Sequence, residues 1–177
     1  MTASVVDTNV AVVANGAHPQ AGQECMRECI LALQGIQQQG RVVVDSGMLI
    51  FTEYFGKLSL SGQPGVGDAF FKWLWSIQGD PERCEPVDIT PADGSFREFP
   101  ADPALNGFHA DDHKFVAVAL ASKSDPEVLN AVDSDWWAYR TALANHGVRV
   151  RFLCPGLFAG RGRPGAPGTQ RGRHDQG

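Results

Sequence analysis

The sequence predicts an α/β protein: a three-layer α/β/α arrangement around a central, mainly parallel sheet. Short apolar runs rich in valine alternate along the chain with longer segments of helical periodicity. These runs are apolar throughout, as expected for strands of a parallel sheet that is covered on both faces. With 177 residues, 43% of them hydrophobic, the chain suits one domain large enough to bury a sheet between helices.

The first half of the chain is expected to supply two strands and three helices. Asp45 or Ser46 is a good N-cap for the second of these helices. The third carries a stripe of aromatic side chains at helical spacing, which is typical of core packing. In order, the expected elements are a strand over 3–7, a helix over 19–39, a strand over 41–47, a helix over 47–58 and a helix over 68–77.

The second half is expected to supply up to three strands and two helices. Acidic residues open the first of these helices, where the helix dipole favours them. In order, the expected elements are a short strand within 85–94, a loop over 95–109, a buried helix over 111–124, a strand over 128–132, a helix over 136–146 and an edge strand over 148–152. Residues 160–177 are rich in Gly, Pro and Arg, so we expect a disordered tail after a domain over 1–159.

The four cysteines show neither a paired CxxC nor the dense pattern of a secreted framework, so reduced thiols are expected. Cys25 and Cys29 lie four apart on a predicted helix, which leaves a metal site open beside the simpler interpretation of two small packed side chains. The longest apolar run, residues 115 to 121, is too short to span a bilayer. Asp7 interrupts the apolar N-terminus, so the sequence predicts a cytoplasmic protein with no membrane segment.

Acidic residues follow the predicted strands or open the predicted helices at one edge of the sheet. Because ligand sites in parallel sheets lie beyond the carboxyl ends of the strands, we expect these side chains to meet. Carboxylates packed together require protons or cations, and a set of oxygen ligands suits Mg²⁺ or Mn²⁺. That chemistry indicates metal-assisted cleavage of a phosphodiester. Asp7, Asp133 and Asp135 follow strands, Asp111 and Asp112 open a helix, and Glu53 lies in the first half of the helix after the second strand, close to the same edge.

Four motifs in this order resemble the PIN-domain family of metal-dependent ribonucleases, over about residues 3 to 153. They are Asp7-Thr8-Asn9 after a strand, Glu53 in "MLIFTEY", Asp112 in "DDHKFVAVALA" and Asp133 in "NAVDSDW". The resemblance implies an endoribonuclease in which Asp7, Glu53, Asp112 and Asp133 hold Mg²⁺ or Mn²⁺ and act in catalysis. Many members of that family are toxins of bacterial toxin–antitoxin pairs, so it also implies an RNA substrate, a homodimer and a small antitoxin partner.

The resemblance assigns supporting roles to four further residues. Asn9, and with it Thr8, is expected to order the first carboxylate by hydrogen bonding. Asp135 is expected as an outer member of the acidic group. Asp111 stands beside Asp112, and the D-x-K-F spacing favours Asp112 as the ligand. The family often has Thr or Ser two positions before its last catalytic Asp, a position that Ala131 occupies here.

Each acid also has a purely structural interpretation. Asp7 can cap the turn that follows it, and Asp112 and Asp133 can cap helices. Glu53 can pair with Lys57 one helical turn later. His109 and His113 lie four apart, but without the Glu of a HExxH zinc motif they are expected to be a loop histidine and an exposed helix histidine.

Two other functions compete with the nuclease. The first is a catalytically silent interaction module of the same fold, in which the acids only sustain structure. The second is a phosphatase with Asp7 as its nucleophile. That chemistry commonly has a second acid two residues later, and Asn9 occupies this position.

Overall fold

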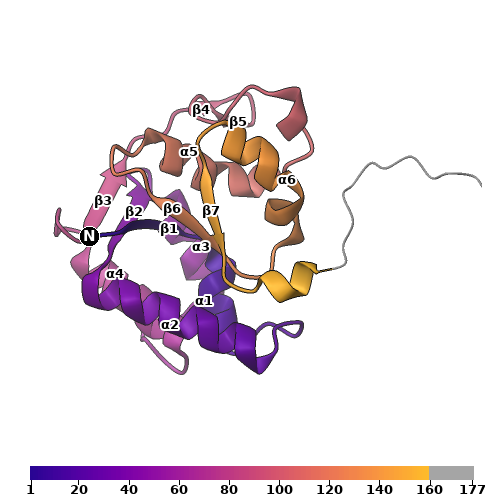
Figure 1. Ribbon diagram of the computed structural model, residues 1–177. Helices are drawn as coiled ribbons and strands as arrows, with labels where there is room; N and C mark the ends of the chain where they lie inside the picture. The colour runs from indigo at the N-terminus through magenta and orange to yellow at the C-terminus, as the bar shows by residue number, and fades with distance from the viewer. Residues whose placement is uncertain (160–177) are drawn as a thin grey trace, which may run out of the picture.

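The computed structural model describes residues 1–159, which fold around a five-stranded sheet (Figure 1). The strand order is β3-β2-β1-β6-β7, and every neighbouring pair is parallel. All five carboxyl ends therefore lie at one edge of the sheet. The strands are β1 (Ala3–Val6), β2 (Arg41–Asp45), β3 (Cys84–Val87), β6 (Glu127–Asn130) and β7 (Arg149–Phe152).

Helices cover both faces of this sheet. In Figure 1, α1, α2 and α4 form one layer, and α5 and α6 lie on the opposite side. This arrangement confirms the predicted three-layer α/β/α fold. The helices are α1 (Thr8–Ala14), α2 (Gln23–Gln39), α3 (Leu49–Lys57), α4 (Val66–Ile77), α5 (His113–Ala121) and α6 (Ser134–Asn145). The short 3₁₀ turns are η1 (Pro103–Leu105), η2 (Ala110–Asp112) and η3 (Pro155–Phe158).

Helix α1 has no counterpart among the expected elements. Its sequence, TNVAVVA, contains three β-branched valines, which have low intrinsic helix propensity. Burial compensates for this, because five of its seven residues are buried between the sheet and the neighbouring helices. The helix begins directly after Asp7, so it sets the position of the first acid.

Close packing against α4 holds α1 in place. A Cβ atom at Gly67 would lie 2.0 Å from the carbonyl oxygen of Ala11, so only glycine permits this approach. Asp68 is buried beside it and accepts hydrogen bonds from the backbone N–H groups of Ser59 and Gly65. The carboxylate of Asp68 therefore organises the turn before α4.

The segment expected as a loop over 95–109 contains structure of its own. A hairpin joins β4 (Pro91–Ala92) to β5 (Ser95–Phe96), with Asp93 and Gly94 at positive φ in its turn. The following residues fold over His113, whose ring stacks on Phe99 with 3.7 Å between ring centroids. The expectation of an exposed histidine at 113 is thus wrong, because the loop that covers the ring leaves no periodic signal in the sequence.

Cys25 and Cys154 form a disulfide between α2 and the segment after β7, and Cys29 and Cys84 are free and buried. The expectation of four reduced thiols is therefore wrong for one pair. These two cysteines are 129 residues apart, so only the fold brings them together. Within residues 1–159, the helices are too short or too polar to cross a lipid bilayer. The predicted tail over 160–177 lies outside the described residues.

Candidate metal centre

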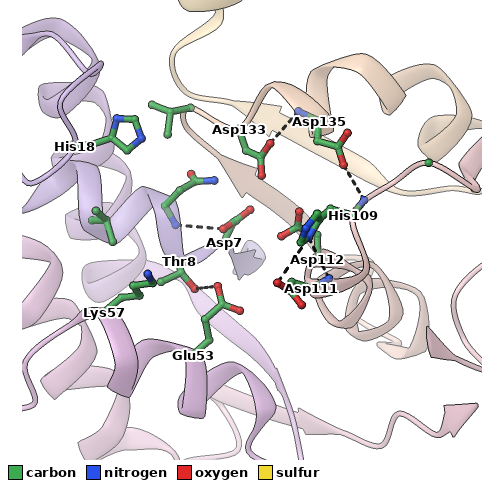
Figure 2. A pocket seen from close by; sticks show the side chains of 14 residues that line it. Asp7, Thr8, His18, Glu53, Lys57, His109, Asp111, Asp112, Asp133 and Asp135 are labelled. Carbon is green, nitrogen blue, oxygen red and sulfur yellow. Dashed lines mark hydrogen bonds and ion pairs between the residues drawn. The ribbon is translucent and has the colours of Figure 1, made fainter. Parts of the chain in front are cut away.

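The acids meet at the carboxyl edge of the sheet, between β1 and β6. In the sheet, β2 and β3 lie on one side of β1, and β6 and β7 lie on its other side. The junction between β1 and β6 is therefore the point where the strand order reverses, which is where ligands bind in parallel sheets. A cavity of about 700 Å³ opens there (Figure 2). Six of its lining residues are acidic: Asp7, Glu53, Asp111, Asp112, Asp133 and Asp135.

Three of these acids converge, and we call Asp7, Asp112 and Asp133 the acidic triad. One carboxylate oxygen from each lies within 4.8 Å of the other two. In Figure 2 the three side chains point into the same space from three different segments of the chain. The described residues thus place three oxygen donors where one cation can reach all of them.

Two members of the triad also act as helix caps. Asp7 accepts a hydrogen bond from the backbone N–H of Asn9 at 3.2 Å and caps α1. Asp133 accepts one from Asp135 N–H at 2.8 Å and caps α6. The capping interpretation is therefore correct for both residues. Capping occupies one oxygen of each and fixes the direction of the carboxylate toward the cavity.

Burial and mutual repulsion make the triad difficult to ionise. Asp7 is only 4% exposed, and its pKa is raised well above the usual range, first by burial and then by the neighbouring Asp112. Burial, with Asp133 and Glu53, raises the pKa of Asp112 to about 7. Among the ion pairs that the structure describes, none involves a member of the triad. The site therefore brings together three carboxyl groups that no ion pair among the described residues neutralises.

Two asparagines connect the ends of β1 and β6. The side-chain oxygen of Asn9 accepts the backbone N–H of Ala131 at 2.9 Å, so Asn9 anchors β6 with its side chain and orders Asp7 only through its backbone. The side-chain nitrogen of Asn130 donates to Asp7 at 3.4 Å. Asn130 is fully buried; the sequence reasoning missed it, although a polar residue at the end of an apolar strand was the available signal.

Glu53 lines the same cavity but is not a member of the triad. Its oxygen Oε1 accepts the hydroxyl of Thr8 at 2.7 Å, and Oε2 pairs with Lys114. Thr8 therefore binds Glu53 and not Asp7, which corrects its expected role. The expected partner of Glu53, Lys57, lies on the cavity wall, whereas Lys114 forms the ion pair and was missed by the sequence reasoning.

The remaining candidates lie at the rim. Asp135 accepts the backbone N–H of His109 at 2.8 Å, so it ties α6 to the segment before η2. The Asp111 side chain is 85% exposed, and its carboxylate lies 3.7 Å from Nδ1 of His109. Of these two neighbouring acids, Asp112 and not Asp111 belongs to the triad, which is the residue that the D-x-K-F spacing favours.

The cysteines form a second cluster, in which Cys29 lies within 4.8 Å of the disulfide sulfurs. The bond between Cys25 and Cys154 occupies two of these three sulfurs. Burial raises the pKa of the Cys29 thiol to about 12, so its metal-binding thiolate form is disfavoured. The acidic triad is therefore the better candidate for a metal.

Comparison of the chain with protein-family models, curated proteins and solved structures finds no match. Three carboxylates without nitrogen or sulfur ligands suit a hard divalent cation such as Mg²⁺ or Mn²⁺. The nearly complete burial of Asp7 among like charges is consistent with a cation there.

Proposed function

We propose that this protein is a metal-dependent endoribonuclease that hydrolyses RNA phosphodiester bonds with Mg²⁺ or Mn²⁺. The observation that carries the proposal is the acidic triad: three carboxylates from distant segments meet, and no ion pair among the described residues neutralises them. The order of the four motifs, which resembles that of PIN-domain ribonucleases, supports the same activity. In this proposal Asp7, Asp112 and Asp133 form the catalytic group, and Glu53, which the resemblance also assigns to it, lines the same cavity.

The triad would hold the ion, and the surrounding residues would keep the triad in position. When bound, the ion would supply Lewis acidity that activates water for attack and stabilises negative charge on the leaving oxygen. Asp7 and Asp133 keep their orientation because each caps a helix. Asn9 fixes the distance between the first and last acids by joining α1 to the backbone after β6.

The charge of the cavity is consistent with such a substrate only when a cation is present. A phosphate diester is repelled by the acidic lining, whereas a divalent ion on the triad would reverse the local sign. His18, Lys57 and His109 line the cavity as well and are positioned to contact the RNA backbone. On the resemblance, the proposal also includes a cytoplasmic location, a homodimer and an antitoxin partner.

Cleavage of single-stranded RNA by the metal-free protein, before and after addition of Mn²⁺, tests this proposal. We expect Mn²⁺-dependent cleavage in the wild type and its loss in Asp7→Asn and Asp112→Asn, with the circular dichroism spectrum retained. Asp111→Asn is the matched control, because its exposed carboxylate lies outside the triad. Absence of cleavage in the folded, Mn²⁺-supplemented wild type contradicts the proposal and favours the silent interaction module.

The phosphatase alternative has its own readout. If Asp7 were a nucleophile, a phosphate-ester substrate would leave an acid-stable mass increase on the peptide that contains Asp7 after rapid quenching. The nuclease proposal expects no such adduct. Detection of an aspartyl-phosphate at Asp7 would replace it with the phosphatase.

A further inference from the structure

The acids of the cavity fall into two groups with different partners. The acidic triad has no ion-pair partner among the described residues, whereas Glu53 has a hydrogen-bond or ion-pair partner on each oxygen. Thr8 donates to Oε1, and the Lys114 ammonium pairs with Oε2. Thr8 belongs to the first turn of α1 and Lys114 to the first turn of α5. Glu53 therefore ties α1 and α5, the two helices that follow Asp7 and Asp112.

Lys114 is held firmly in this arrangement. Its side chain is only 12% exposed, and its ammonium group also donates to the backbone carbonyl of Asp111. The same nitrogen lies 4.8 Å from the centre of the Phe115 ring, within range of a cation–π contact. A buried ammonium that leaves Glu53 would lose a charge-assisted partner in a region of low dielectric constant, so the pair resists separation.

We infer that the site holds a single divalent ion on the acidic triad, and that Glu53 is a positioning residue and not a ligand. This inference rests on the proposed function. A second ion 3.5–4 Å from the first, as in two-metal sites, needs further carboxylate oxygens. Outside the triad the partly buried acids of the cavity are Glu53 and Asp135. The two oxygens of Glu53 already serve Thr8 and Lys114, and Asp135 accepts the backbone N–H of His109. The Lys114 ammonium also repels a cation that approaches Glu53.

The inference changes what each acid is expected to do. Removing a triad member removes a ligand, whereas removing Glu53 removes a brace between α1 and α5. Because Glu53→Gln leaves Lys114 buried without its charged partner, that single variant can lose stability. The double variant Glu53→Gln/Lys114→Met removes the pair as a whole and leaves no uncompensated charge at this position.

Titration of the full-length, metal-free protein with Mn²⁺, followed by calorimetry and by the electron paramagnetic resonance signal of free Mn²⁺, measures both stoichiometry and affinity. We expect one Mn²⁺ per chain in the wild type. We expect Asp112→Asn to weaken binding by more than about 100-fold, beyond the loss that is typical when only an outer partner of the ligands is removed. The double variant is expected to bind one Mn²⁺ with a Kd raised about tenfold, as is typical when an outer partner of metal ligands is lost. Glu82→Gln, an exposed glutamate away from the cavity, is the matched control.

The outcomes separate this inference from the proposed function. Two Mn²⁺ per wild-type chain, or a double variant that is weakened as much as Asp112→Asn, overturns the inference and leaves the nuclease proposal standing. A wild type that binds no Mn²⁺ overturns the metal-dependent function itself. One bound ion that the double variant retains, together with loss of binding in Asp112→Asn, supports both.

Discussion

Replacing Asp112 with asparagine should stabilise the metal-free protein at neutral and alkaline pH. In the folded protein the pKa of Asp112 is raised from 3.8 to about 7, chiefly by burial and then by the charges of Asp133 and Glu53. The unfolded chain ionises this carboxyl near its ordinary value. Between about pH 4 and pH 7, folding therefore requires Asp112 to take up a proton, and above pH 7 it requires the charge to be buried.

The sign and the size of the effect follow from this difference. The two pKa values lie about three pH units apart, which corresponds to about 4 kcal/mol at 1.36 kcal/mol per unit. Because Asp112 is partly exposed, solvent screening reduces the expected effect to about 2 kcal/mol. The stability that the neutral acid contributes is complete below about pH 4 and lost as the pH rises through about 7. The neutral asparagine side chain does not incur that loss.

Urea unfolding in a chelator at pH 4, 6 and 8, followed by circular dichroism, measures the difference. Asp112→Asn and the wild type should have similar free energies of unfolding at pH 4, and the variant should exceed the wild type by about 2 kcal/mol at pH 8. Asp111→Asn controls for the general effect of removing one charge, and should change the stability by no more than about 0.5 kcal/mol. A difference between Asp112→Asn and the wild type that is independent of pH would refute the explanation that burial and the neighbouring charges raise the pKa of Asp112.

Three further predictions concern the elements that support the site. Gly67→Ala should lower the free energy of unfolding by about 1–3 kcal/mol in chemical denaturation, because its Cβ would meet the Ala11 carbonyl. Gly35→Ala on α2 has open space around its Cβ, so it should raise the free energy of unfolding by up to about 1 kcal/mol in the same series. Cys154→Ser should lower the free energy of unfolding by about 2–5 kcal/mol. In a thermal melt, dithiothreitol should lower the melting temperature of the wild type and leave that of this variant unchanged. Asn9→Ala leaves the backbone N–H of Ala131 without its partner, so it should lower the free energy of unfolding by about 1–3 kcal/mol and weaken Mn²⁺ binding in calorimetry. Unchanged Mn²⁺ affinity would argue against the role of Asn9 in joining the two strand ends.

The layered fold was predictable because strands and helices alternate along the chain, and the apolar run of β2 is buried from Val42 to Asp45. The same pattern explains why Asp7 and Asp133 were placed together: each follows a strand, and parallel strands end at one edge. The boundaries were less accurate. β6 ends at Asn130 and α6 begins at Ser134, because Asp133 caps the helix earlier than expected.

The features that the sequence did not reveal depend on tertiary contacts. Helix α1 forms from a valine-rich segment because its surroundings bury it, and intrinsic propensity gives no sign of this. The hairpin β4–β5 consists of two-residue strands, which are too short for an alternating pattern. The ion-pair partner of Glu53 is Lys114 on α5 and not Lys57, which lies one turn later on the same helix. The packing of α5 against α3 brings Lys114 to Glu53, and the sequence spacing does not show this contact.

The bond between Cys25 and Cys154 joins one of the first helices to the segment after the last strand. A single protease cut anywhere between these two positions therefore leaves both pieces covalently joined. Such a nicked molecule migrates as one species in denaturing electrophoresis without reductant and as two after reduction. Limited proteolysis run under both conditions therefore locates exposed loops, such as the one around Gly62, and reports the oxidation state of this pair in the same gel.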